Sequence, residues 1–76
     1  MTEEHKEKLE EIRKRIRSLI DEISLITFKE EVRLRDVPHT ERRSAEYQKM
    51  KIELGYATWA EKYLNSANRA LIEATK

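Results

Sequence analysis

The sequence predicts an all-α protein in which two long antiparallel helices form a helical hairpin that packs into a symmetric homo-oligomeric bundle. The chain contains one glycine and one proline among 76 residues and is rich in Glu, Lys, Arg, Leu, Ile and Ala, a composition typical of long helices. In the first half, apolar residues recur at alternating spacings of three and four. The single proline, Pro38, marks where the chain turns back, and residues 1–76 are expected to form one domain.

The first helix is expected over residues 3–35. Thr2 can cap its start, and Glu3 and Glu4 follow in the first turn, where carboxylates interact favourably with the helix dipole. The apolar residues of this helix form a heptad seam that offers a narrow stripe to a partner helix: Leu9, Ile12, Ile16, Leu19, Ile23 and Ile26. The seam stops after Ile26, so the packing face is expected to change there.

A turn is expected at residues 36–40 and a second helix at residues 41–74. Pro38 disfavours helical backbone at the residue before it, and either Asp36 or Thr40 can cap the second helix. The later part of this helix carries a row of small and aromatic residues: Tyr56, Ala60, Tyr63, Ala67, Ala70 and Ala74. So many alanines indicate that helices approach each other closely.

The size of the chain predicts self-association. A chain this short buries only about 60% of the surface that its unfolded form exposes, and it has no cysteine for disulfides. A hairpin alone has one face to bury, whereas both helices carry apolar residues beyond a single contact. We therefore expect several hairpins to pack together.

Charge and hydropathy exclude other classes of protein. Lys and Arg (16) nearly balance Asp and Glu (15), whereas proteins that grip long DNA usually carry a clear basic excess. No apolar run approaches the roughly 18 residues of a membrane span, and residues 1–8 lack the apolar core of a signal peptide. A soluble, cytoplasmic protein is expected.

Catalytic and metal-binding patterns are absent from the sequence. There is no cysteine, and the two histidines, His5 and His39, fall near a terminus and in the expected turn. Neither an HExxH motif nor a glycine-rich phosphate loop is present. The sequence therefore predicts a protein that is not an enzyme and that binds no cofactor or metal.

Basic and aromatic residues near the start of the second helix are the strongest candidates for ligand binding. Arg42, Arg43 and Ser44 are expected in its first turn, where free backbone N–H groups favour an anion. Arg42, Lys49 and Tyr56 are seven residues apart and so share one side of the helix. Together with Tyr47, they could bind a small phosphorylated, base-containing ligand or RNA. As alternatives, the aromatic rings belong to the core or an interface, and Lys49 extends to solvent.

A second basic cluster, "RKRIR" at residues 13–17, has a simpler interpretation. Glu10 and Glu11 lie close by in the sequence and can pair with its basic side chains on a solvated helix face. If variants of the first cluster bind a ligand like the parent protein, this cluster is the next candidate for the site.

The order Arg43, Lys49, Ile52 and Gly55-Tyr56 resembles the second helix of small phage proteins that act as cyclic-nucleotide sponges. These proteins counter CBASS, the bacterial cyclic-oligonucleotide antiphage signalling defence. The resemblance covers about 25 residues of the 76. It implies a compact homohexamer of helical hairpins that sequesters cyclic dinucleotides, and in some members cyclic trinucleotides, between protomers.

The resemblance also implies roles for individual residues. Arg43 and Lys49 match basic positions of the family, and Tyr56 matches its aromatic residue. Family members further use an N-terminal aromatic residue and a lysine with a nearby hydroxyl group. No aromatic residue precedes Phe28 here, so the expected substitutes are a stacking histidine and three polar residues: His5, Lys14, Arg17 and Ser18.

The expected function is therefore non-catalytic sequestration of a cyclic dinucleotide, with a small oligomeric adaptor or regulator that binds a partner protein or RNA as the alternative. Gly55 fits either function in a specific way. Glycine costs about 1 kcal/mol relative to alanine within a helix, so a glycine in this otherwise helical stretch needs a reason. We interpret it as a notch that lets a ligand or another helix approach the backbone.

Overall fold

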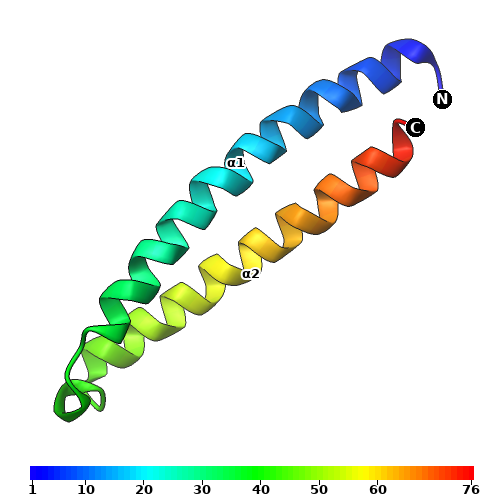
Figure 1. Cartoon of the computed structure of the whole chain (residues 1–76). Coiled ribbons are helices and arrows are strands. Elements are labelled where there is room, and N and C mark those ends of the chain that lie inside the picture. The colour runs from blue at the N-terminus through cyan, green and yellow to red at the C-terminus, as the bar shows by residue number, and fades with distance from the viewer.

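The computed structural model describes residues 1–76 and confirms the helical hairpin (Figure 1). Helix α1 spans Glu3–Arg35, a short 3-10 helix η1 spans His39–Glu41, and helix α2 spans Ala45–Ala74. The two long helices run antiparallel, with both chain termini at one end and the turn at the other. The molecule is an elongated rod with extents of 58 × 15 × 14 Å.

Helix α1 begins as its sequence predicts and continues without interruption. The backbone N–H of His5 donates to Oγ1 of Thr2 at 3.2 Å, so Thr2 is the N-cap. The helix passes through residues 26–30, where the heptad seam stops, and ends at the C-cap Asp36. Asp36 therefore closes α1 and does not cap the second helix.

Helix α2 begins at Ala45, four residues later than the sequence predicts. Pro38 has extended backbone angles, and the chain then makes the single 3-10 turn η1. Ser44 is the N-cap, since its Oγ accepts from the backbone N–H of Tyr47 at 3.1 Å. The predicted caps Asp36 and Thr40 are thus wrong. Arg42 and Arg43 precede the helix and do not lie in its first turn.

The contact between the helices is narrow and partly polar. Only three residues of the chain are buried, namely Ile20, Thr27 and Leu34, and they follow one another at intervals of seven along α1. Leu9, Ile16 and Ile23 of the predicted seam are half-buried at the same contact. The other three members of that seam, Ile12, Leu19 and Ile26, are exposed. α1 therefore turns a stripe toward α2 that overlaps only half of the predicted one.

A polar layer near the middle of the hairpin explains why this stripe of α1, and not the predicted one, faces α2. Oγ1 of Thr27 donates to Oε1 of Glu61 at 2.9 Å, and Oγ of Ser24 donates to Oε2 at 3.1 Å. Both carboxylate oxygens of Glu61 thus have partners inside the contact, as buried polar groups require. Sliding either helix would separate these groups, so the layer fixes the register.

At the open end of the hairpin, Glu10 links α1 to the C-terminal end of α2. Its Oε2 accepts from Oγ1 of Thr75 at 3.2 Å, and its Oε1 accepts from Nε of Arg13 at 3.0 Å. The hydrogen bond from Arg13 is the main reason that the pKa of Glu10 lies below its ordinary value of 4.5. The ionised carboxylate is therefore favoured in the folded state.

Replacing Glu10 with Gln should destabilise the protein at neutral pH but not in acid. Because the pKa of Glu10 is lowered on folding, its contribution is complete above the unfolded value and is lost as the pH falls through the folded value. Urea unfolding at pH 7 and pH 3 measures the difference between Glu10→Gln and the parent. Glu11→Gln, an exposed neighbour, is the control. If Glu10→Gln and the parent differed by the same free energy of unfolding at both pH values, the lowered pKa assigned to Glu10 would be contradicted.

Candidate ligand-binding surface

The side of α2 that faces away from α1 carries a row of large exposed side chains. Ile52, Tyr56, Trp59 and Tyr63 are spaced by four, three and four residues, so they lie along one side of the helix. Each is about 60–70% exposed. The rings of Tyr56 and Trp59 meet edge to face, with centroids 5.9 Å apart and an interplanar angle of 85°. We call these four residues the aromatic row.

Gly55 forms a hollow within the aromatic row. Ile52, Gly55, Tyr56 and Trp59 line this hollow, which we call the Gly55 notch. A Cβ atom built on Gly55 meets nothing within 4 Å, and the residue does not have a positive φ. Nothing in the single chain therefore requires glycine at this position. The notch gives an approaching group direct access to the helix backbone.

Two of the predicted cations lie ahead of the notch. Lys49 is on the same side of α2 as Tyr56, and its Nζ is 4.0 Å from Oε1 of Glu53. An exposed pair at this distance holds the side chain weakly, so the Lys49 ammonium group is free to bind an anion. Arg43 is exposed just before the cap Ser44. Its guanidinium group makes no hydrogen bond or ion pair in the structure.

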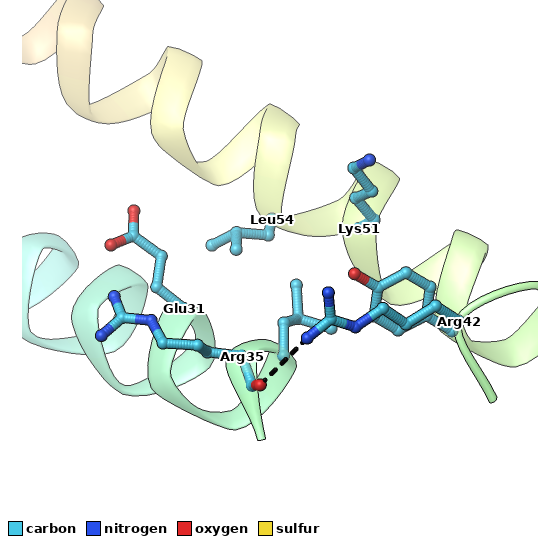
Figure 2. A pocket seen from close by; sticks show the side chains of 7 residues that line it. Glu31, Arg35, Arg42, Lys51 and Leu54 are labelled. Carbon is cyan, nitrogen blue, oxygen red and sulfur yellow. Dashed lines mark hydrogen bonds between the residues drawn. The ribbon is translucent and has the colours of Figure 1, made fainter. Parts of the chain in front are cut away.

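Arg42 and Tyr47 belong to a different surface, beside the turn. Figure 2 shows Arg42 reaching from the segment between η1 and α2 to the end of α1, where its Nη2 donates to the carbonyl oxygen of Arg35 at 3.2 Å. Its Nε donates to the carbonyl oxygen of Val37 at 3.1 Å. Arg42 therefore has a structural role in fastening the turn. The groove around it, called the turn-end groove, is lined by residues of both helices: Glu31, Leu34, Arg35, Arg42, Tyr47, Lys51 and Leu54.

Two basic members of the turn-end groove were not predicted from the sequence. Arg35 and Lys51 add positive charge to the turn-end groove, against the single carboxylate of Glu31. Lys51 is four residues after Tyr47, a spacing that places both on one helix face and could have indicated the pairing. Arg35 is brought in only by the fold of the turn.

The remaining candidates lie far along α1. His5, Lys14, Arg17 and Ser18 are all exposed in its N-terminal half, and Arg17 pairs loosely with Asp21 at 3.9 Å. At 1.5 Å per residue, Ser18 is roughly 25 Å along the helix from Arg35 at the turn. One chain therefore does not bring these residues to either the Gly55 notch or the turn-end groove.

These surfaces offer groups that could bind a ligand. The notch combines flat aromatic rings with the weakly paired ammonium group of Lys49 one or two turns away. No cluster of three or more His, Asp or Glu side chains is arranged to hold a metal ion. The notch is formed by a single helix and is open on one side. A ligand bound there would remain partly exposed unless a second chain covered it.

Comparisons of the chain with protein-family models, with curated proteins and with solved structures find no match. Neither α1 nor α2 has a segment that is both long and apolar enough to pass through a membrane.

Proposed function

We propose that this protein is a non-catalytic sponge that sequesters a cyclic dinucleotide in the cytoplasm, at pockets between protomers of a homo-oligomer, expected to be a hexamer. Sequestration without chemical change would counter a CBASS-type defence of the host cell. The observation that carries the proposal is the Gly55 notch, where exposed aromatic rings and an accessible backbone occur together, with Lys49 ahead of it on the same side of α2 as Tyr56.

The chemistry of a cyclic dinucleotide matches these groups. Such a ligand has two bases, and a base stacked on an aromatic ring gains about 1–3 kcal/mol. Tyr56 and Trp59 would supply the rings, and Lys49 and Arg43 would contact the phosphates. The ligand is close to two-fold symmetric, so two copies of one notch, related by a two-fold axis, can present the same contacts to each half. The near-neutral net charge of the chain is compatible with two phosphates.

In this proposal, residues that one chain holds apart reach the ligand from different protomers. His5, Lys14, Arg17 and Ser18 would come from a neighbouring α1, since they lie too far from the notch of their own chain. Arg42 and Tyr47 would border the pocket from the turn. Arg42 is held by two backbone carbonyls, so it would offer its remaining N–H groups without loss of side-chain freedom.

A second candidate function is an adaptor or regulator that binds a partner protein or RNA. The turn-end groove favours it, because Arg35, Arg42 and Lys51 concentrate positive charge there. RNA would bind such a groove in a strongly salt-dependent manner. A cyclic dinucleotide in an enclosed pocket should depend less on salt, so titrations at two salt concentrations distinguish the two functions.

Calorimetric titration of the purified protein with a panel of cyclic di- and trinucleotides tests the sponge directly. We expect binding at micromolar or lower concentration, and intact nucleotide after release by heat. Arg43→Ala and Lys49→Ala should each weaken binding about tenfold, which is 1.4 kcal/mol, without changing oligomer size. Lys62→Ala, which removes an exposed charge elsewhere on α2, should bind like the parent.

Three results would count against this function. Absence of heat with every nucleotide at micromolar concentration would exclude the sponge. Degraded nucleotide would identify a nuclease instead. Parental binding by both Arg43→Ala and Lys49→Ala would move the site away from the notch, with residues 13–17 as the next surface to examine.

A further inference from the structure

The turn-end groove gathers positive charge that the protein does not neutralise. It has a volume of about 370 Å³, within the range of roughly 300–1,000 Å³ that is usual for small-molecule sites. Arg35, Arg42 and Lys51 line it together with a single carboxylate, that of Glu31. None of these four side chains takes part in an ion pair. The lining therefore carries a net charge of +2, from three cations and one carboxylate.

Helix stabilisation explains only part of this charge. Arg35 lies in the last turn of α1, and Arg42 binds carbonyl oxygens at the same end of that helix. Cations there interact favourably with the helix dipole. Lys51 belongs to α2 and lies nearer its N-terminal end, where the dipole gives a cation no such benefit. The dipole of α1 therefore accounts for two of the cations and leaves the third unexplained.

Arg42 is held in a position that leaves one end of its guanidinium group free. Its Nε and Nη2 each donate to a backbone carbonyl oxygen, those of Val37 and Arg35 respectively. Three of the five N–H groups of an arginine therefore remain, including both on Nη1. The end formed by Nη1 and Nη2 can donate to two oxygens of one anion. Figure 2 shows this guanidinium group in the space between α1 and α2.

The other walls of the groove are apolar or aromatic. Leu34 is only 8% exposed, and Leu54 and Tyr47 are half-buried. These three side chains line the groove beside the cations, and the phenol ring of Tyr47 offers a flat face on which a planar group can stack. The groove therefore matches a small molecule that has one anionic end and one flat, weakly polar part.

We infer that the turn-end groove binds a small phosphate monoester. At neutral pH such a phosphate carries about −1.5 to −2 charges on three terminal oxygens, which matches both the net charge and the three cations of the lining. A phosphate diester has one charge and two terminal oxygens, so it matches the groove less well. The inference goes beyond the proposed function, because a cyclic dinucleotide contains only diesters and is assigned to the Gly55 notch.

Titration with adenosine 5′-monophosphate (AMP) and with 3′,5′-cyclic AMP tests this match. The two nucleotides share a base and a sugar, but the first is a monoester and the second is a diester. NMR chemical shifts of isotope-labelled protein, in a buffer without phosphate, follow both titrations. AMP should bind about tenfold more tightly, the effect of one additional charge-assisted contact. Equal affinities, or no change in shifts with AMP at millimolar concentration, would overturn the inference.

Variants of the lining locate the site. Arg35→Ala and Lys51→Ala should each weaken AMP binding about tenfold, since each removes a contact to a charged group. Arg33→Ala is the control for Arg35→Ala, because Arg33 lies two residues away and pairs with Glu30 at 3.8 Å. Lys62→Ala, at an exposed position farther from the turn, is the control for Lys51→Ala. Parental binding by both Arg35→Ala and Lys51→Ala would overturn the site.

Removing the carboxylate should have the opposite effect. Glu31→Gln takes away the only negative charge of the lining, so inorganic phosphate should bind it several-fold more tightly than it binds the parent. A residue that only supports the fold would not strengthen binding when it is replaced. Unchanged or weaker binding of inorganic phosphate by Glu31→Gln would contradict a phosphate beside this side chain.

RNA oligonucleotides with and without a 5′-phosphate distinguish the sources of a monoester. Binding that requires the 5′-phosphate would support the monoester chemistry, with an RNA end as its source. RNA binding that is tighter than that of AMP and independent of the 5′ group would show that the groove holds the diester backbone, and would overturn the inference. A protein that binds a cyclic dinucleotide but not AMP would retain the sponge and exclude this site, and the reverse result would retain this site and exclude the sponge.

Discussion

Replacing Ile20 with alanine is expected to destabilise the protein by about 2–5 kcal/mol, the range observed for large-to-small changes in a packed core. Ile20 is only 4% exposed, less than any other residue of the chain. Small domains have a total stability of about 5–15 kcal/mol, so the substitution should remove much of it. Urea unfolding followed by circular dichroism measures the loss, at a protein concentration held constant because unfolding of an oligomer depends on concentration.

Leu25→Ala is the matched control for Ile20→Ala. Leu25 lies on the same helix but is 54% exposed, so the same kind of truncation should cost less than about 1 kcal/mol. Equal losses at the two positions would show that Leu25 is covered in the assembled protein and that the α1–α2 contact is not the main core.

The hairpin itself could be predicted because local signals agree on it. Helix-forming residues fill both halves of the chain, Thr2 precedes two carboxylates, and Pro38 interrupts the pattern once. None of these signals depends on contacts between distant residues. Agreement among propensity, capping and turn chemistry is what makes a fold readable from sequence.

The start of α2 could not be predicted from the same signals. Asp36, Thr40 and Ser44 are all good N-cap residues, and their local sequences do not rank them. The choice depends on the 3-10 turn after Pro38 and on Arg42, which binds the carbonyl oxygens of Val37 and Arg35. These contacts form only once the chain has folded back.

The sequence pattern also could not predict which side of α1 faces α2. Two neighbouring stripes, one containing Ile12 and Leu19 and the other containing Ile20 and Leu34, are similarly apolar. The heptad spacing predicts that a stripe packs but not which partner it meets. Glu61, on the other helix, selects the stripe that contains Thr27, and the large side chains of the other stripe, such as Ile12 and Leu19, stay exposed.

The candidate site was predictable in part. A seven-residue spacing correctly placed Lys49 and Tyr56 on one side of α2, since that follows from helix geometry alone. The separation of Arg42 from Lys49 could not be foreseen, because it depends on where α2 begins. Any joint role for Lys14 or Arg17 requires a second chain, whose position the pattern within one chain does not specify.

Replacing Gly55 with alanine should have opposite effects on the free protein and on its ligand complex. A Cβ at this position meets nothing within 4 Å in the single chain, so alanine should stabilise the free protein by about 1 kcal/mol through its higher helix propensity. The same Cβ would occupy the Gly55 notch, so binding of a cyclic dinucleotide should weaken. Gly55→Leu should weaken it further, because a larger side chain fills the space beside Tyr56 and Trp59.

Thermal unfolding without nucleotide and calorimetric titration with it measure the two effects separately. Ser66→Ala, at an exposed position of α2 one heptad beyond Trp59, should also stabilise the helix but should leave binding unchanged. If Gly55→Ala stabilised the protein and bound nucleotide like the parent, the notch would have no role in binding. If Gly55→Ala destabilised the free protein, a helix of another protomer would already fill the notch. Glycine at position 55 would then serve assembly and not ligand access, which would place the ligand at the turn-end groove.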